Sequence, residues 1–356
     1  MSQGALSLAL LLGGVNAACA PAPAAPAALA PEPSSGAAPA QVWSAKTGRR
    51  YTGRVVVDDE TVYAGSVDRK VYAVDLATGQ VRWSSRLGGI IGGGVLVAGD
   101  TVYAASGRPE GRVYALDGRT GKRLWRTNTG TISASLALIH GVLVAETQRG
   151  DVLGLDPAAG TIRWRRQVGF ARIEAVPGDS GTLVVATIDS LVRLSATDGK
   201  VVRRARSPGA IVSPWLIHRG LLTAGTTDSG VVAIDPVDLR RRWRVKLDAP
   251  VLGSPAAQGD TLYAVSRRGT LYRIAPDSMP VAAAIAELDW PVTSSVRVLD
   301  GAVLLGGADG ILRALRPDGT EVWRLQLRSP VELGPVALAD GLLAIGGDGD
   351  LHRYRR

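Results

Sequence analysis

Histidine and cysteine, the side chains that most often bind transition metals or act as nucleophiles, are scarce in this chain of 356 residues. The three histidines, His140, His218 and His352, are far apart and lack the spacing of a metal site. Aspartates beside glycines, as at 348–350, resemble fragments of calcium loops, but ordinary turn chemistry explains them. Serines are plentiful, yet none stands in a Gly-x-Ser-x-Gly nucleophile elbow. We therefore expect no catalytic residues, no metal site and no bound cofactor.

The single cysteine, Cys19, lies where a lipid anchor would be attached. An apolar stretch at 5–12, too short to span a bilayer, comes before it, and small residues stand directly next to it. This arrangement resembles a bacterial lipoprotein signal. It predicts a signal peptide at 1–19, acylation of Cys19, and a semi-rigid Pro/Ala-rich linker at 20–40.

Two features depart from that signal. Asn16 occupies a position that is usually apolar, and no Lys or Arg precedes the apolar stretch. The alternative is ordinary signal-peptidase cleavage after Ala17 or Ala20, which would release a soluble secreted protein. Both interpretations predict export. With one cysteine the chain cannot form an intramolecular disulfide, so the fold must depend on packing.

The charge balance is basic, with 41 Lys and Arg against 32 Asp and Glu and a formal net charge of +9. Such a balance can indicate nucleic acid, a lipid surface or an acidic protein as a partner. The arginines are scattered rather than gathered into one run, which favours biased amino-acid usage as the explanation. We therefore expect no nucleic-acid partner.

One phrase recurs along the chain: an apolar strand, a short turn, a second strand ending in Asp, then Thr-Gly and Trp. It is clearest at 61–83 and 101–125, and later copies keep the spacing with weaker sequence. The second strands end 39 to 42 residues apart, at Asp75, Asp117, Asp156, Ser195, Asp235, Ala275, Leu315 and Arg355. The chain therefore contains eight copies of one repeat.

Each copy has the composition of β-strands. Segments such as 71–74 and 261–265 are short, rich in β-branched and aromatic residues, and bounded by Gly and Asp. About 40 residues with four strands form one propeller blade. The last copy ends after its third strand, whereas the phrase at 42–47 precedes any strand of its own. We therefore predict an all-β, eight-bladed β-propeller of four-stranded antiparallel blades over 41–356. The N- and C-terminal strands would close the ring in one blade.

Tryptophans follow the same repeat. The fourth copy has Arg203 at the tryptophan position, and the sixth copy lacks the Thr-Gly-Trp phrase. A large flat ring at a fixed offset would fill the space between adjacent blades where the ring widens. We expect this structural role for Trp43, Trp83, Trp125, Trp164, Trp243 and Trp323.

The phrase Tyr-Ala-(Val/Leu)-Asp-x-x-Thr-Gly-x-x-x-Trp, at 72–83 and 114–125, resembles that of the pyrroloquinoline-quinone-like (PQQ-like) repeat family. The resemblance covers 41–356 and implies the propeller fold. One branch of the family, the quinoprotein dehydrogenases, binds PQQ and calcium over the central channel and carries a vicinal cysteine pair. That pair is impossible here, because the chain has one cysteine. Asp289 and Glu332 are the candidates for a carboxylate near the channel.

A second branch, the outer-membrane lipoprotein of the β-barrel assembly machinery, is similar in size, signal, stalk and compact blades. This resemblance implies a non-enzymatic, monomeric scaffold, exported and anchored in the cell envelope, that docks on the barrel insertase or another envelope protein. No short motif marks contact residues here. The alternative is a propeller that binds a small molecule such as a quinone or a sugar, or a quinoprotein-type oxidoreductase.

Arginines gather at equivalent places in the third, fourth and fifth copies. On neighbouring blades they would form one patch suited to an acidic partner, or solvated edges where charge blocks strand pairing. They are Arg163, Arg165, Arg166, Arg203, Arg204, Arg206, Arg240, Arg241, Arg242 and Arg244. Trp215 and Trp290, with Met279, would add an apolar recognition surface if they are exposed rather than packed in the core.

Overall fold

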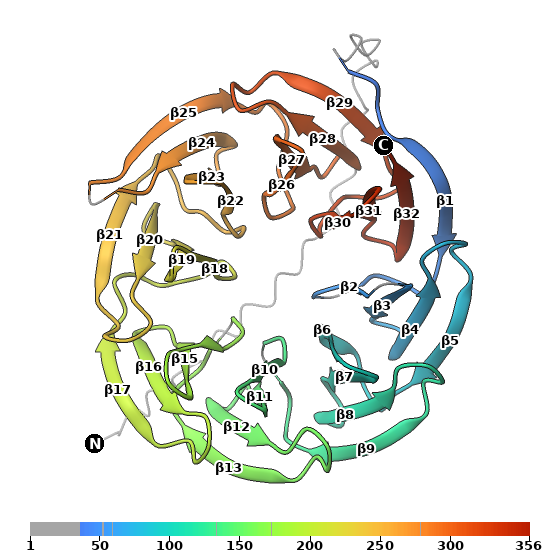
Figure 1. The fold of residues 1–356 in the computed structure, drawn as a ribbon, viewed down its shortest axis with the longest axis vertical. Helices are drawn as coiled ribbons and strands as arrows, with labels where there is room; N and C mark the ends of the chain where they lie inside the picture. Colours follow the sequence, from blue (N-terminus) through green and yellow to red (C-terminus); the bar gives the residue numbers. More distant parts are fainter. Residues whose placement is uncertain (1–35, 52, 59, 133, 172, 278) are drawn as a thin grey trace, which may run out of the picture. The chain divides into compact units, whose positions relative to one another are not determined.

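The computed structural model describes residues 36–356 except 52, 59, 133, 172 and 278. Every regular element in this part of the chain is a β-strand, and the strands form eight four-stranded antiparallel sheets around a central axis (Figure 1). The predicted eight-bladed propeller is thereby confirmed. Cys19 and most of the predicted linker lie outside the described residues. No helix in the described part is long and apolar enough to cross a membrane.

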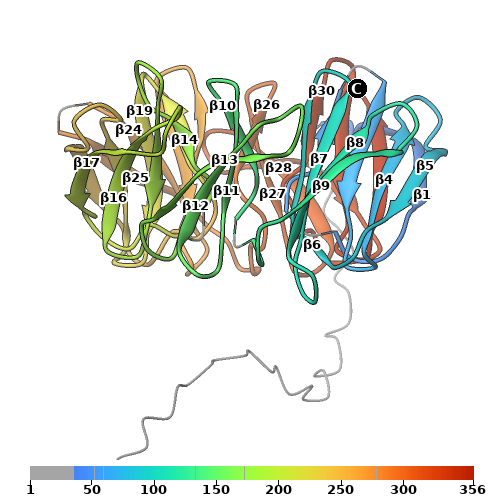
Figure 2. The same ribbon diagram turned by 90° about the horizontal axis from the view of Figure 1, so that it is seen from below.

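Each blade runs from an innermost strand near the axis to an outermost strand at the rim, and the strands pass between the two faces of the ring (Figure 2). Blade 1 contains β2 (Val56–Val57), β3 (Thr61–Gly65), β4 (Lys70–Asp75) and β5 (Val81–Arg86). Blade 2 contains β6 (Ile91–Ala98), β7 (Thr101–Ser106), β8 (Arg112–Asp117) and β9 (Arg123–Asn128). Blade 3 contains β10 (Ala137–Ile139), β11 (Val142–Glu146), β12 (Asp151–Leu155) and β13 (Ile162–Gln167). Blade 4 contains β14 (Val176–Pro177), β15 (Thr182–Ala186), β16 (Ser190–Ser195) and β17 (Val201–Arg206).

The second half of the ring follows the same plan. Blade 5 contains β18 (Leu216–His218), β19 (Leu221–Thr226), β20 (Gly230–Ile234) and β21 (Arg241–Lys246). Blade 6 contains β22 (Ala256–Gln258), β23 (Thr261–Val265), β24 (Thr270–Ala275) and β25 (Val281–Glu287). Blade 7 contains β26 (Arg297–Leu299), β27 (Ala302–Gly306), β28 (Ile311–Leu315) and β29 (Glu321–Gln326). Blade 8 contains β30 (Val336–Leu338), β31 (Gly341–Ile345), β32 (Asp350–Arg355) and β1 (Ala40–Lys46).

Blade 8 is built from both ends of the described chain. Its outermost strand β1 pairs antiparallel with β32, from Ala40 opposite Arg355 to Lys46 opposite Asp350. The prediction that the terminal strands close the ring in one blade is therefore confirmed. Figure 1 shows the two strands side by side, one blue and one dark red.

The middle strands of a blade are buried on both faces, whereas the outermost strands are half-exposed. Every residue of β3, β11 and β15 is buried, in keeping with their nearly continuous apolar sequences. In β5 and β9 the burial instead alternates, and the half-buried positions include Trp83 and Trp125. One face of each outermost strand must therefore pack against a neighbouring blade.

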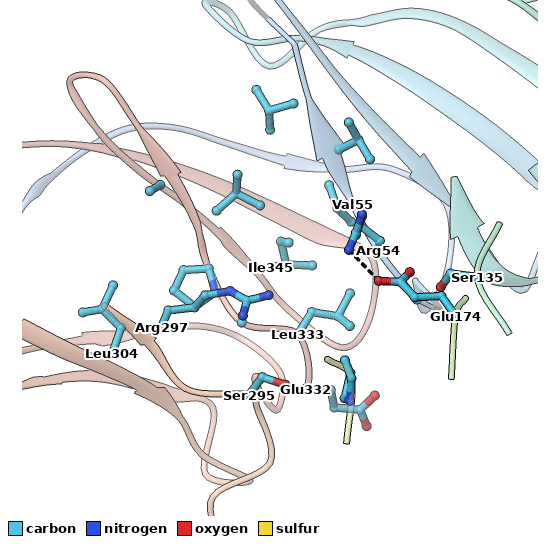
Figure 3. A pocket seen from close by; sticks show the side chains of 18 of the residues that line it. Arg54, Val55, Ser135, Glu174, Ser295, Arg297, Leu304, Glu332, Leu333 and Ile345 are labelled. Carbon is cyan, nitrogen blue, oxygen red and sulfur yellow. Dashed lines mark hydrogen bonds and ion pairs between the residues drawn. The ribbon is translucent and has the colours of Figure 1, made fainter. Parts of the chain in front are cut away.

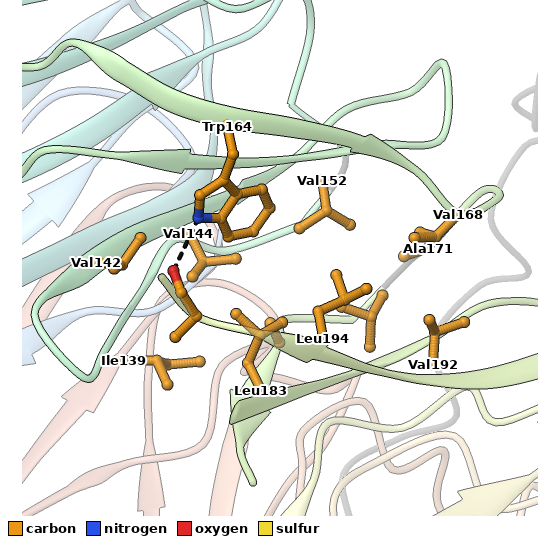
Figure 4. Packing of buried hydrophobic residues seen from close by; sticks show 13 residues of the cluster. Ile139, Val142, Val144, Val152, Trp164, Val168, Ala171, Leu183, Val192 and Leu194 are labelled. Carbon is orange, nitrogen blue, oxygen red and sulfur yellow. Dashed lines mark hydrogen bonds between the residues drawn. The ribbon is translucent and has the colours of Figure 1, made fainter. Parts of the chain in front are cut away.

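The core of the described ring is divided among the junctions between blades. Each of the eight buried clusters draws its residues from two adjacent blades. Figure 4 shows the one between blades 3 and 4, where Trp164 and Val144 face Leu183 and Leu194. Burial of apolar surface is thus shared around the whole ring, and each blade is stabilised by both of its neighbours.

Candidate functional site

Four tryptophans join one blade to the next through the same contact. Each lies on an outermost strand, and its indole Nε1 donates a hydrogen bond to a backbone carbonyl in a turn of the following blade. The pairs are Trp43 with Leu76 (2.9 Å), Trp83 with Gly118 (2.7 Å), Trp125 with Pro157 (3.0 Å) and Trp164 with Ala196 (2.8 Å). These contacts join blades 8, 1, 2, 3 and 4 in sequence.

A glycine in the same turn makes room for the tryptophan ring. A Cβ at this glycine would lie 2.4–2.7 Å from indole atoms, closer than real contacts allow, and its φ of 66–75° also favours glycine. The glycines are Gly79, Gly121, Gly160 and Gly199. The turn glycine of the repeat therefore receives the tryptophan of the preceding blade, and we call this packing of indole on glycine the tryptophan–glycine contact.

The aspartate that opens the turn fixes its shape. In blade 1, Asp75 Oδ1 accepts hydrogen bonds from the backbone N–H and the hydroxyl of Thr78, both at 2.8 Å. The hydrogen bond from Arg82, followed by those from Thr78, lowers the pKa of Asp75 to about 2. Because the carboxylate accepts all of these bonds, it stays ionised and holds the turn at neutral pH.

Among the described residues, the rest of the ring, from the junction of blades 4 and 5 onward, lacks this contact. Arg203 replaces the tryptophan in blade 4, opposite Arg193. Trp243 in blade 5 is buried, with 6% of its surface exposed, but its indole makes no hydrogen bond to a described residue. Trp323 in blade 7 is half-buried beside the segment before β1, where Gly36 N–H bonds the Val322 carbonyl at 3.0 Å.

The predicted arginine surface forms an arc of the rim on β13, β17 and β21, with Arg240 directly before β21 (Figure 1). We call it the arginine arc. Much of it is paired within its own blades. The ion pairs are Arg163–Asp156 (2.5 Å), Arg165–Asp151 (3.4 Å), Arg242–Asp235 (2.6 Å), Arg242–Asp238 (2.9 Å) and Arg244–Asp228 (2.8 Å). Two more side chains bond carbonyls of the adjoining blade: Arg166 to Gly199 (2.9 Å) and Arg204 to Val168 (3.3 Å).

Four further arginines of the arc are exposed, and their side chains have neither a described carboxylate within 4.0 Å nor a hydrogen bond to a described residue. They are Arg203, Arg206, Arg240 and Arg241. One of the four, Arg241, lines a notch of about 780 Å³ between β21 and the turn before β25, where Met279 is 84% exposed. This part of the arc therefore offers unpaired positive charge beside exposed apolar surface.

The two tryptophans outside the repeat do not add to the arc. Trp215 is 9% exposed and belongs to the core cluster between blades 4 and 5, so we remove it from the candidate surface. Trp290 is half-buried and packs in the cluster between blades 6 and 7. The guanidinium of Arg313 lies 4.2 Å from the centre of the Trp290 ring, which covers it further.

A cavity of about 750 Å³ lies at the axis of the ring, lined by loops and innermost strands of several blades (Figure 3). One equivalent position can be defined in each blade: it lies two residues before the innermost-strand residue that pairs with the third residue of the second strand. In chain order it is occupied by Arg54, Gly94, Ser135, Glu174, Pro214, Ser254, Ser295 and Gly334. Six of these residues line the cavity, and the two charged ones are among the six.

Those two charged residues bond to each other across the channel. Arg54 Nη2 lies 2.9 Å from Glu174 Oε1, although blade 1 and blade 4 are not neighbours (Figure 3). Behind Glu174, the carboxyl of Glu146 is fully buried, and burial raises its pKa well above the ordinary value. We did not predict this pair from the sequence. Its signal is that Arg54 and Glu174 are the two charged residues at a position that is uncharged in the other six blades.

A second arginine, Arg297 on β26, also lines the cavity. Its side chain is accessible within the channel, but the surrounding protein, and then the charge of Arg54, lowers its pKa. Glu332 lines the cavity as well, and its carboxylate pairs with Arg50 at 2.7 Å. Of the two predicted candidates for a channel carboxylate, Glu332 is therefore at the channel.

The channel residues do not fit the calcium and PQQ site of the quinoprotein dehydrogenases. In the described residues, no three His, Cys, Asp or Glu side chains gather closely enough to hold a metal ion. The two acidic residues of the cavity, Glu174 and Glu332, are each bonded to an arginine. His218 and His352, whose pKa values are lowered by burial, belong to different blades.

Eight four-stranded blades and the Asp-x-x-Thr-Gly-x-x-x-Trp phrase define an eight-bladed β-propeller of the PQQ-like class. A family model described as outer membrane protein assembly factor BamB matches residues 33–176 and 173–279. The chain belongs to this family.

Two curated relatives carry the name outer membrane protein assembly factor BamB. The one from Nitrosomonas eutropha is 26% identical over 113 residues, and the one from Burkholderia pseudomallei is 26% identical over 132 residues. The matches cover 32% and 37% of this chain, and they span 28% and 35% of the two relatives.

Solved structures resemble the whole propeller at low sequence identity. BamB from Moraxella catarrhalis has a TM-score of 0.76 and 17% identity, covering 90% of this chain and 100% of its own. A computationally designed protein, Ika8, has a TM-score of 0.72 and 14% identity, covering 89% and 100%. A quinohemoprotein alcohol dehydrogenase from Pseudomonas putida has a TM-score of 0.66 and 15% identity, covering 88% and 76%. At these identities the likeness shows the fold alone.

Proposed function

We propose that this chain is a non-enzymatic scaffold of the cell envelope that binds a protein partner during assembly of outer-membrane β-barrel proteins. The observation that carries the proposal is the BamB family match, which covers more than half of the chain. The BamB structure that aligns over 90% of the chain supports it. In this proposal the segment 1–19 directs export, and a lipid on Cys19 anchors the propeller through the linker at 20–40.

The exposed part of the arginine arc is the proposed partner surface. Arg203, Arg206 and Arg241 present positive charge with no described carboxylate within 4.0 Å, and Arg241 lines the notch that also holds the exposed side chain of Met279. A partner with an acidic face and an apolar side chain would fit both features. The paired arginines Arg163 and Arg242 serve their own blades in this proposal.

A redox role receives less support. The likeness to the alcohol dehydrogenase concerns the fold, and the channel offers paired carboxylates rather than free calcium ligands. A small-molecule role has one observation in its favour, the cavity of about 750 Å³ at the axis, whose size is within the range of ligand pockets.

The test of the scaffold function is the abundance of outer-membrane barrel proteins in cells that lack this chain. Quantitative mass spectrometry of outer membranes should show barrel proteins reduced as a class, with lipoproteins unchanged and wild-type expression restoring the level. Expression of Cys19→Ser should restore it less, because the propeller would not be anchored. Unchanged barrel-protein levels in the deletion strain would contradict the proposal.

A further inference from the structure

Arg297 is an exception to a rule that the other seven blades follow. It is the residue of the innermost strand that pairs with the third residue of the second strand, Leu304. The equivalent residues are all aliphatic: Val56, Leu96, Ala137, Val176, Leu216, Ala256 and Val336. Each of these packs in the cluster between its own blade and the next. Blade 7 therefore carries a cation where packing alone favours an aliphatic side chain.

The neighbouring blade makes room for this arginine. A Cβ on Gly334 of blade 8 would lie 3.2 Å from Cγ and 3.4 Å from Nε of Arg297, so the glycine lets the side chain lie over its backbone. The guanidinium then reaches into the cavity (Figure 3). Among the described residues, its hydrogen-bond partner is the carbonyl of Val296, at a long 3.3 Å, and no carboxylate lies within 4.0 Å.

The nearby charges leave this cation uncompensated. Glu174 is engaged by Arg54, and Glu332 by Arg50. The Arg297 guanidinium is accessible within the channel, and the positive charge of Arg54 acts on it unfavourably. An anion in the cavity would relieve this repulsion, and a carboxylate suits the position because it accepts two parallel hydrogen bonds from a guanidinium.

We propose that the channel cavity binds a small organic carboxylate, whose charged group is held by Arg297 with Arg54. Its apolar body lies against the walls formed by Leu304, Leu333 and Ile345. Ser135 and Ser295 stand at the same cavity and can bond polar substituents. The volume of about 750 Å³ accommodates such a molecule. This site does not depend on the scaffold function or on the arginine arc.

The test uses 2-naphthoate as the probe, titrated into the full chain by isothermal calorimetry. Wild-type protein should bind one molecule saturably, and Arg297→Leu should bind at least about tenfold more weakly. The neutral analogue 2-naphthalenemethanol should also bind at least about tenfold more weakly than the acid. Arg203→Leu, which removes an exposed arginine of the rim, is the matched control and should bind like wild type.

Thermal unfolding separates loss of the site from loss of the fold. Because leucine occupies this position in blades 2 and 5, Arg297→Leu should unfold at or above the wild-type temperature. Three results would overturn the proposal: no saturable binding of 2-naphthoate to wild type, equal binding by a folded Arg297→Leu, or equal binding of the alcohol.

Discussion

Trp164 of blade 3 packs its ring over Gly199 of blade 4 and donates its indole N–H to the carbonyl of Ala196, 2.8 Å away (Figure 4). The same contact recurs at three other junctions and is missing from the second half of the described ring. The repeated phrase therefore joins adjacent blades. Within one copy, the glycine receives the tryptophan of the preceding blade, and the tryptophan packs on the glycine of the following blade.

The tryptophan–glycine contact predicts that Gly199→Ala is more destabilising than a positive φ alone explains. Gly141→Ala is the matched control, because Gly141 has φ 73° and open space around its Cα, whereas Gly199 has φ 66° and the indole of Trp164. We expect a cost of about 1–2 kcal/mol for the control. Gly199→Ala should cost about 1–3 kcal/mol more, because the added methyl overpacks the contact. Chemical denaturation measures both, and equal costs would contradict the contact.

The indole hydrogen bond can be isolated by Trp164→Phe, with Trp243→Phe as its control. Both tryptophans are buried, 8% and 6% exposed, but the indole of Trp243 makes no hydrogen bond to a described residue. Trp164→Phe should therefore lose about 1–3 kcal/mol of unfolding free energy more than Trp243→Phe, since the Ala196 carbonyl is left without its donor. Urea denaturation of the two variants gives the difference, and a larger loss for Trp243→Phe would disprove this account.

The buried Glu146 predicts a particular dependence of stability on pH. Burial, together with the charge of Glu174, raises its pKa above the ordinary 4.5. The folded state thus keeps a proton that the unfolded state releases, so wild-type stability falls as pH rises above about 4.5. Glu146→Gln removes this loss and should stabilise the protein by about 1 kcal/mol or more at pH 8, with little effect at pH 4.

Melting temperatures between pH 4 and pH 8 would test the Glu146 prediction. Glu287→Gln, which removes a negative charge from the exposed edge of β25, is the control. A stability difference between Glu146→Gln and wild type that is the same at every pH would contradict the raised pKa, because it would show that folding does not change the protonation of this carboxyl.

Charge reversal should separate the partner surface from the rest of the rim. Arg203→Glu combined with Arg241→Glu should weaken partner binding at least tenfold and reduce its salt dependence, because both arginines are exposed. Arg123→Glu combined with Arg126→Glu, on the exposed outermost strand of blade 2, keeps the same net charge and should bind like wild type. If both double variants lost partner affinity equally, the loss would be due to the change in net charge and not to the arginine arc.

Fold and ring closure could be predicted from the sequence because the repeat is local. One turn of the repeat is specified by three residues that are close in the chain, Asp75, Thr78 and Gly79. Eight copies of the repeat at nearly even spacing are compatible with few folds. The ion pairs between arginines of the arc and aspartates of the same blade were not predicted, although these partners are also close in the chain. Asp156 and Arg163 are seven residues apart and bond within one blade, which weakens the case for the arc as a uniform positive surface.

The channel could not be predicted in the same way. Arg54 and Glu174 are 120 residues apart, and only the closed ring brings them together. No local sequence motif marks Arg297. It is recognised as unusual only when the strand register shows that the equivalent residues of the other seven blades are aliphatic. Trp215 was placed on a possible surface because its position outside the repeat gives no sign of burial.

The central claim is that the propeller docks on the barrel-assembly machinery, and affinity capture of tagged full-length protein from cross-linked membranes tests it most directly. The account predicts that mass spectrometry finds the outer-membrane barrel insertase enriched with the wild-type chain, and less so with Arg203→Glu/Arg241→Glu. An intact bait that enriches the insertase no more than an unrelated envelope lipoprotein does would contradict it.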